Sequence, residues 1–187
     1  MTLDILGLFP VTTKGNRYVL ALMDYFTKWL EAVLIPDYEA SIVAKELVRI
    51  WISCYGVPMI LHSYQGTNFN SVLFTELCKL LGILKIRTRE LHPESDGMVE
   101  RFNRTILNHL SLFVSTEWDT HLPPFLLGYR SADHEVTGLT PGEILFGRTL
   151  RLPCGILFDR PSDTPSSPNE YMKNLEARLG SAHAFAR

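Results

Sequence analysis

The sequence predicts a mixed α/β domain built on a five-stranded sheet. Three apolar segments follow one another closely near the N-terminus, which favours an antiparallel meander. Helical and strand patterns then alternate along the chain, which is typical of strands joined by crossover helices. The 187 residues, of which 46% are hydrophobic and 20% charged, suffice for one domain with a sizeable core.

The expected strands are short apolar runs that end at turn residues. The first ends near Gly7 and Pro10, and the third is closed by Pro36. The last strand alternates apolar and basic side chains, which indicates two faces of different character. In chain order, the five predicted strands cover residues 2–8, 17–24, 29–35, 59–62 and 83–88.

The expected helices show apolar residues at helical spacing. We expect Asn68 or Asn70 to cap the second helix and Gly82 to end it. The predicted helices cover residues 39–54, the segment from this cap to Leu81, a segment that carries Glu100 and ends near Val114, and residues 121–132 and 170–185. The inward side chains of the second helix are expected to be Leu73, Phe74, Leu77 and Leu80.

Composition shifts divide the chain into three parts. Residues 153–168 are rich in proline, serine and aspartate, which is typical of a linker. We therefore expect a core over residues 1–152 and a helical tail over residues 169–187.

Several classes of protein are excluded by the sequence. No apolar run approaches the roughly 18 residues that span a membrane. The apolar start lacks preceding basic residues and is interrupted by Asp4, so we do not expect it to be a signal peptide. No cysteine or histidine spacing supports a zinc site. The three cysteines are expected to be reduced core thiols of an intracellular protein, and they are Cys54, Cys78 and Cys154.

Charge is unevenly distributed, although the net charge is only −2. Residues 79–104 hold six basic and four acidic residues, whereas each flank is net −2. This local excess favours a side of the molecule that faces phosphate.

The segment from His92 to Thr105 joins a proline- and glycine-containing loop to a helical pattern. On the polar face of that helix, Glu100, Asn103 and Arg104 lie three or four residues apart. A carboxylate, an amide and a guanidinium suit a metal ion and a phosphate backbone. The alternative is a solvated helix face with ordinary charges.

This segment, HPESDGMVERFNRT, resembles the signature of the integrase catalytic core domain of retroviruses and long-terminal-repeat retrotransposons, most closely the Gypsy-type branch. The resemblance implies that Glu100 is the third acid of a catalytic triad. It places the second acid 35 intervening residues upstream, at position 64, where the surrounding LHSYQGTNF segment also matches. However, Tyr64 stands where the family has aspartate. The first acid is then Asp4, in the opening strand.

The resemblance covers about residues 2–152, including the Gypsy-like segments YRSA and LFGR near its end. It implies a ribonuclease-H-like fold, in which a five-stranded mixed sheet is flanked by helices. It also implies DNA integration by metal-dependent strand transfer, with Mg²⁺ or Mn²⁺ held by Asp4 and Glu100. The expected location is intracellular, in the nucleus.

Tyr64 makes impaired catalysis the expectation. A phenol has a pKa near ~10, so it is neutral at physiological pH and a poor magnesium ligand. Asp24 and Asp96 are the other acids that we considered as replacements. Because metal sites tolerate little misplacement, we expect neither to restore the site.

The same motifs supply candidates for DNA contact. Gln65 and Asn68 follow position 64, and Arg101, Asn103 and Arg104 follow Glu100. The alternative is a solvated surface charge for each arginine and a helix cap for Asn68.

Two competing functions remain. One is an integrase-type core that is catalytically impaired and binds DNA, as a homodimer or higher homo-oligomer. The other is a co-opted, non-catalytic module for dimerisation or protein interaction, since family cores usually dimerise through helices such as those at 39–54 and 121–132. An unrelated nuclease of the same fold is disfavoured by the Gypsy-like segments.

Overall fold

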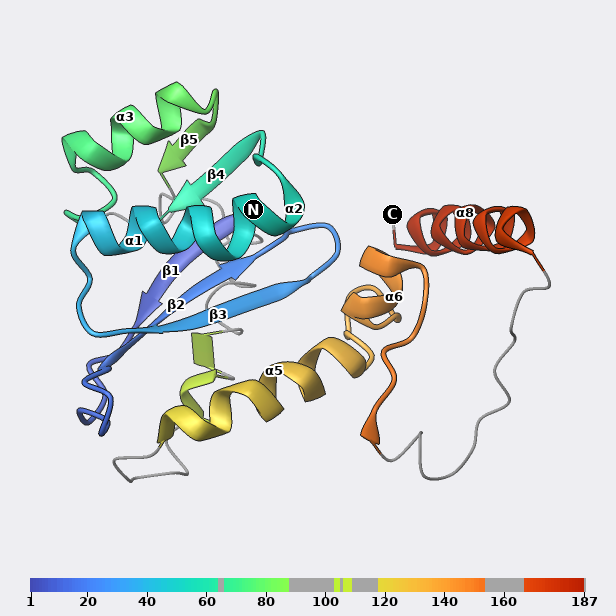
Figure 1. Cartoon of the computed structure of the whole chain (residues 1–187), viewed down its shortest axis with the longest axis horizontal. Coiled ribbons are helices and arrows are strands. Elements are labelled where there is room, and N and C mark those ends of the chain that lie inside the picture. Colours follow the sequence, from blue (N-terminus) through green and yellow to red (C-terminus); the bar gives the residue numbers. More distant parts are fainter. Residues whose placement is uncertain (64–65, 88–102, 105, 109–117, 154–166, 187) are drawn as a thin grey trace. The chain divides into compact units, whose positions relative to one another are not determined.

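The structure is a computed structural model that describes residues 1–63, 66–87, 103–104, 106–108, 118–153 and 167–186 (Figure 1). The chain forms two compact units. The first consists of residues 1–25 and 30–126, and the second of residues 26–29 and 127–187. The boundaries that we predict at residues 152 and 168 both fall within the second unit and stay predictions.

The first unit contains a five-stranded mixed sheet with the strand order β3-β2-β1-β4-β5 (Figure 1). β1 is antiparallel to β2, β2 is antiparallel to β3, and β4 and β5 continue the sheet in parallel with β1. The predicted meander and the predicted fold class are therefore confirmed. The strands are β1 (Thr2–Leu6), β2 (Tyr18–Met23), β3 (Leu30–Ile35), β4 (Ile60–Ser63) and β5 (Leu84–Arg87).

The register of the sheet places Asp4 at the centre of the unit. β1 is the middle strand, and Asp4 is paired with Ala21 of β2. Leu3 is the register partner of Ser63, so the carboxyl end of β4 lies beside Asp4's neighbour. Apolar side chains bury the strands around this point, among them Leu3, Leu20, Leu22 and Leu61.

A long helical stretch begins at Ala40, one residue after the predicted start, but it is not uniform. α1 (Ala40–Glu46) continues into the π-helical segment η1 (Leu47–Ile52) and the short α2 (Ser53–Tyr55). Its buried stripe includes Val43, Leu47 and Trp51. The stretch ends at Gly56, whose φ of 84° is the left-handed conformation that favours glycine.

α3 (Val72–Leu80) corrects the predicted cap and part of the predicted inward face. Ser71 is the cap residue, and its hydroxyl accepts from the Phe74 amide at 3.2 Å. Phe74 is buried, but Leu73 and Leu80 are 52% and 84% exposed. The face of α3 that carries Phe74 packs against the core. Leu73 and Leu80 lie on the neighbouring faces of the helix, at the edge of this contact.

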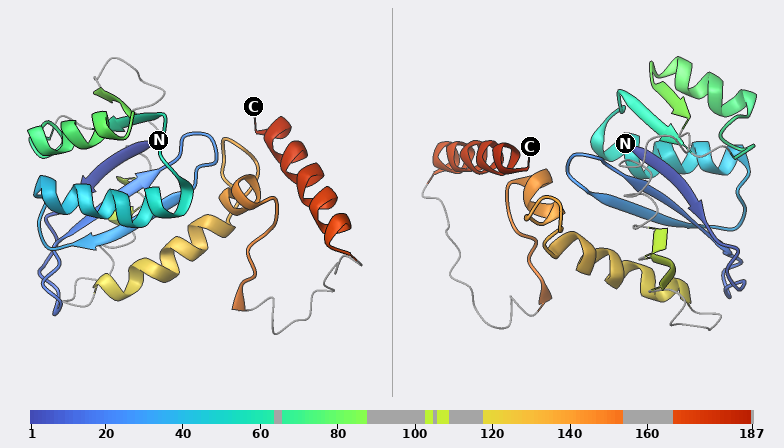
Figure 2. Two further views of the ribbon diagram at one scale, coloured as in Figure 1. Left: turned by 45° about the horizontal axis from the view of Figure 1, so that its top comes forward. Right: turned by 180° about the vertical axis from the view of Figure 1, so that it is seen from behind.

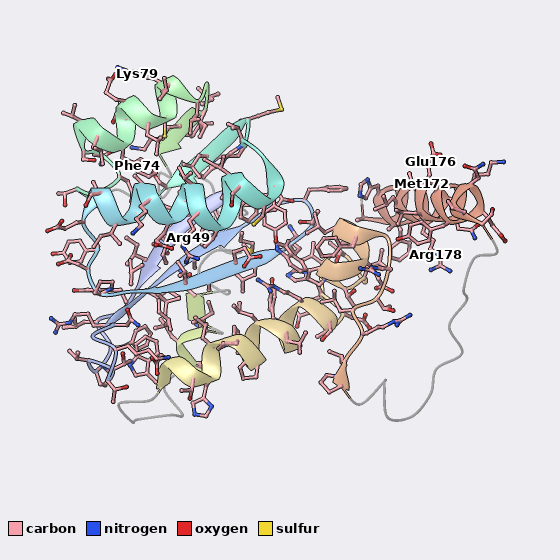
Figure 3. All side chains as sticks on the ribbon, viewed as in Figure 1. Arg49, Phe74, Lys79, Met172, Glu176 and Arg178 are labelled. Atoms are coloured by element: carbon pink, nitrogen blue, oxygen red, sulfur yellow. The ribbon has the colours of Figure 1, made fainter. Side chains whose placement is uncertain are left out.

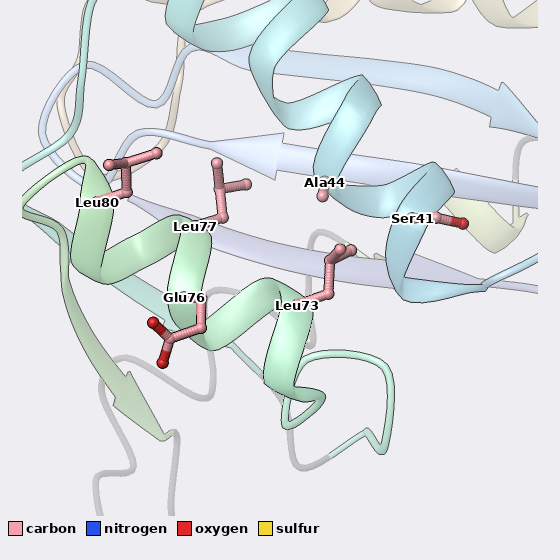
Figure 4. Close-up of a pocket in the computed structure, with 6 residues that line it drawn as sticks. All are labelled: Ser41, Ala44, Leu73, Glu76, Leu77 and Leu80. Carbon is pink, nitrogen blue, oxygen red and sulfur yellow. The ribbon is translucent and has the colours of Figure 1, made fainter.

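These leucines border a groove between α1 and α3, two helices that pack against each other (Figures 2 and 4). The groove has a volume of about 540 Å³. It is lined by Ser41, Ala44, Leu73, Glu76, Leu77 and Leu80 (Figure 4).

The prediction that the cysteines are core thiols is wrong for Cys54, which is exposed near the end of the helical stretch. Cys78 in α3 is buried, as predicted.

η2 (Trp118–His121) and the first residues of α5 (Leu122–Ser131) complete the first unit. Trp118 is 1% exposed, and its Nε1 donates to the Pro10 carbonyl at 2.7 Å. Its ring lies 4.6 Å from that of Phe9. The tryptophan therefore fastens η2 to the chain that follows β1.

In the second unit, α8 (Pro168–Phe185) packs against α6 (Pro141–Phe146). α8 confirms the predicted C-terminal helix, whereas α6 was not predicted. The capping box of Thr140 and Glu143 was the available signal for α6. In α8, Met172, Glu176 and Arg178 are exposed (Figure 3). Among the described residues, no helix is both long and apolar enough to cross a membrane.

Candidate functional site

The candidate site joins two segments that are remote in sequence. Asn103 Nδ2 donates a hydrogen bond to Asp4 Oδ2 at 2.5 Å, across 99 positions of the chain. Asp4 comes from the middle strand of the sheet, and Asn103 from a helical segment that the structure describes at residues 103–104 and 106–108. Ile106, which is fully buried, anchors this segment to the core. Asp4 and Asn103, the last residue of the VERFN motif, therefore meet at one place.

The Asp4 carboxylate is half-buried, and each of its two oxygens accepts a hydrogen bond. Its Oδ1 accepts from the Ile5 amide at 2.8 Å, while Oδ2 accepts from Asn103. Burial raises the pKa of the carboxyl, because the charged form loses hydration, and the hydrogen bonds from Asn103 and Ile5 oppose that effect. Desolvation is the larger influence, so the ionised carboxylate is held in this position at a cost in stability.

Because the ionised Asp4 carboxylate costs stability, we predict that Asp4→Asn changes the melting temperature in a pH-dependent way. A carboxyl with a raised folded-state pKa contributes stability below its ordinary value of 3.8 and loses it as the pH rises through the folded-state pKa. The Asp4→Asn variant should therefore melt at a higher temperature than the parent at pH 7. The difference should close as the pH falls below 3.8.

Thermal unfolding of both proteins from pH 3 to pH 8 checks this prediction. Asp133→Asn, at an exposed side chain, is the control for the substitution itself. A parent that is more stable than Asp4→Asn at pH 7 would contradict the proposed cost of burying Asp4.

Asn103 has an unsatisfied group at this position. Its Oδ1 is buried and has no hydrogen-bond partner among the described residues. A buried carbonyl oxygen beside a carboxylate is chemically suited to a hard divalent cation. The described residues contain no group of three or more acidic, histidine or cysteine side chains that could hold a metal ion, so Asp4 and Asn103 do not make a complete site by themselves.

Most of the other predicted site residues are not among those that the structure describes. Tyr64, Gln65, Glu100 and Arg101 all fall outside the described residues, as does Asp96. Asp24 does not lie beside Asp4: it follows Met23, the partner of Thr2, and so is three residues beyond Ala21 along β2. At about 3.4 Å per residue this displacement is roughly 10 Å, and it places Asp24 past the end of β2 at Met23.

Asn68 is involved in its own turn and does not cap α3. Its carbonyl accepts from the Ser71 amide at 3.3 Å. A Cβ placed on Gly66 would lie 2.3 Å from Asn68 Oδ1, so the side chain folds back over that glycine. Arg104 is exposed one position after Asn103. The roles of Asn68 and Arg104 in DNA contact stay predictions.

Sequence reasoning missed Lys85, which holds the turn that contains Asn68. Lys85 Nζ donates to the Phe69 carbonyl and, at 3.3 Å, to Asn70 Oδ1. The alternation of apolar and basic residues along β5 was the available signal, because alternate side chains of a strand point to one face.

The fold and the motifs together indicate the class of integrase catalytic cores, and the comparisons with known proteins agree. The catalytic core of BIV integrase superposes with a TM-score of 0.59 and 26% identity, covering 76% of this chain and 91% of that core. The HTLV-2 integrase catalytic core gives a TM-score of 0.59 with 18% identity, covering 76% of this chain and 93% of that one. The architecture is therefore the ribonuclease-H-like fold of retroviral integrase cores.

Relatives in sequence point to the same family. The Pol polyprotein of transposon 412 from Drosophila melanogaster is 30% identical over 190 residues, which cover all of this chain. The Gag-Pol polyprotein of gibbon ape leukemia virus is 37% identical over 137 residues, or 71% of the chain. No family model matches. The chain is thus related to the Pol polyproteins of retroviruses and Gypsy-like transposons, as predicted. It spans 15% and 8% of the lengths of these two polyproteins.

Proposed function

We propose that the chain is an integrase-type core that binds DNA and is catalytically impaired by the residue at position 64. The observation that carries the proposal is the hydrogen bond between Asp4 and Asn103. It joins the first acid of the predicted triad to the segment that carries the third, Glu100. A solvated helix face would not need this contact with a half-buried carboxylate in the middle of the sheet.

The donor set does not fit a two-metal centre. Bound divalent metals supply activation of a water or hydroxyl nucleophile and stabilisation of the leaving oxygen in phosphoryl transfer. Asp4 and Glu100 offer hard carboxylate oxygens for this purpose, and Asn103 orients Asp4. Tyr64 offers a neutral phenol where charge and lone pairs are required. The HTLV-2 core has been solved in complex with magnesium, and in our proposal position 64 separates this chain from that behaviour.

DNA binding does not require the second acid. The proposed contacts are made by the residues that the motifs supply, Gln65, Asn68, Arg101, Asn103 and Arg104. A nuclear location follows from this role. Phosphate contacts by basic side chains release counterions, so binding of this kind weakens as salt is added.

Arg104→Ala tests the proposed DNA contact. We expect the variant to bind a DNA duplex about five- to tenfold more weakly than the parent at low salt, and to lower the salt slope by about one counterion. Fluorescence anisotropy with a labelled duplex, repeated over a salt series, measures both quantities. Lys79→Ala is the matched control, since Lys79 is an exposed cation on α3 that pairs with Glu76. Equal losses in the two variants, or salt-independent binding, would contradict the proposal.

The alternative function, a non-catalytic dimerisation or interaction module, is favoured by the groove between α1 and α3. The groove combines small α1 residues with the exposed Leu73 and Leu80, and it does not depend on Asp4 or on a metal ion. Sedimentation velocity with and without the duplex separates the two functions. A dimer that is indifferent to DNA would support this alternative, and DNA binding that depends on salt would support the first.

A further inference from the structure

The segments YRSA (residues 129–132) and LFGR (residues 145–148) have no role in the proposed site, and the structure brings both of them to Trp29. Arg130 of α5 lies over the Trp29 ring, with its guanidinium carbon 4.4 Å from the ring centre. Phe146 of α6 meets the same indole edge-on, with 5.0 Å between the ring centres. Trp29 is 5% exposed and belongs to the turn of residues 26–29, which precedes β3. The two segments therefore hold this turn.

The turn needs such support because its backbone is strained at Lys28. This residue has a φ of 60°, a left-handed conformation that residues other than glycine adopt at a cost. Its side chain is 5% exposed. In the same buried turn, the Trp29 amide donates to Thr27 Oγ1 at 3.1 Å. A strained turn of this kind keeps its conformation only while the surrounding side chains hold it.

α8 packs on the α6 side of the same unit and lies alongside α6 in both views of Figure 2. Leu175 and Leu179 lie close to Gly147 of the LFGR segment, where a Cβ would be 2.9 Å from a side-chain carbon of each leucine. His183 Nε2 donates to the Ile144 carbonyl at 2.9 Å, since a carbonyl can only accept. Ile144 is among the last four residues of α6, whose carbonyls have no partner within the helix. α8 thus supplies a cap for α6.

The same imidazole reaches the turn, but the contact area of α8 is shallow. The His183 ring meets the Phe26 ring edge-on, with 5.2 Å between the ring centres. α8, which the structure describes throughout, has no buried side chain, and its inward residues are only half-buried. An isolated helix of 18 residues is only marginally stable in water, so α8 depends on this docking. A helix with so little burial opens at a lower free energy than the core strands.

We propose that α8 is a detachable helix that holds the strained turn 26–29 while it is docked and leaves as a unit while the sheet stays folded. It acts on the turn by two routes. One is the direct contact of His183 with Phe26, and the other runs through Gly147 to Phe146 and Trp29. The YRSA and LFGR segments then serve to couple the C-terminal helix to the turn. This role does not depend on DNA binding or on a metal ion.

Native-state amide hydrogen exchange of the parent, Leu179→Ala and Met172→Ala tests the proposal. In the parent, we expect the α8 amides to exchange at least about 100-fold faster than the β2 amides. Leu179→Ala removes packing on Gly147 without lowering helix propensity. It should speed exchange of the α8 amides and of the Trp29 amide by a similar factor of about ten, with β2 unchanged. Met172 lies on the same helix and is 60% exposed, so Met172→Ala should change neither.

Three results would overturn the proposal. Protection of α8 equal to that of β2 in the parent would mean that the helix does not detach. Faster exchange of α8 in Leu179→Ala with an unchanged Trp29 amide would mean that α8 does not hold the turn. An equal rise in β2 would mean a general loss of stability. The direct route is checked by Phe26→Ala combined with His183→Ala: the double variant should speed Trp29 exchange by less than the product of the single effects, because both remove one contact. The full product would contradict that contact.

Discussion

Tyr64→Asp is expected to raise magnesium-dependent strand transfer by at least about 100-fold over the parent, the scale on which one strategic electrostatic group acts in an active site. The substitution restores a carboxylate that can bind a cation with charge and lone pairs together. Asp4, held by Asn103, already supplies one such group in the middle of the sheet. The measurement is joining of a labelled oligonucleotide to target DNA, with Mg²⁺ and with Mn²⁺.

Two control variants separate this effect from a general change at position 64. Tyr64→Phe removes the hydroxyl without adding a carboxylate, so it should stay as weak as the parent. Tyr64→Asp combined with Asp4→Asn should lose the gain, because two of three acids are again all that remain. A parent as active as Tyr64→Asp would show that Tyr64 does not impair the chain.

Trp118→Ala is expected to lower the free energy of unfolding by about 4 kcal/mol, as is usual when a buried tryptophan is truncated. The side chain is 1% exposed, donates to the Pro10 carbonyl and lies 4.6 Å from the Phe9 ring, so its removal leaves a cavity and breaks that hydrogen bond. Urea denaturation followed by circular dichroism measures the loss. Leu80→Ala, at a side chain that is 84% exposed, should change stability by less than about 0.5 kcal/mol. Similar losses in the two variants would contradict the assigned packing.

The strands were predictable because their signals are local. A run such as Tyr18–Met23 is apolar throughout and ends at turns, so its hydrophobicity alone marks a buried strand. The cap of α3 was not, because Asn68, Asn70 and Ser71 are all good cap residues. Only the path of the turn, in which Asn68 folds back over Gly66, leaves Ser71 to accept from Phe74. The outward position of Leu80 likewise depends on where α1 lies.

The candidate site, too, was predictable only in part. The motif around Glu100 and the spacing to position 64 are features of the sequence itself, so they indicate the family without any three-dimensional contact. The hydrogen bond between Asp4 and Asn103 spans 99 positions, and the contacts that Lys85 makes with the turn depend on how β5 pairs with β4. Both are long-range contacts that local patterns do not fix: the first depends on how the helical segment of Asn103 packs against β1, and the second on the register of β4 and β5.

We propose that position 64 alone separates this scaffold from a metal-binding integrase core. Calorimetric titration of Mg²⁺ into the parent and into Tyr64→Asp, with Tyr64→Asp/Asp4→Asn as the control, tests it most directly. We predict binding in Tyr64→Asp only, and its loss when Asp4 is also replaced. Comparable binding by the parent and Tyr64→Asp would contradict the claim, because another acid would then fill the role assigned to position 64.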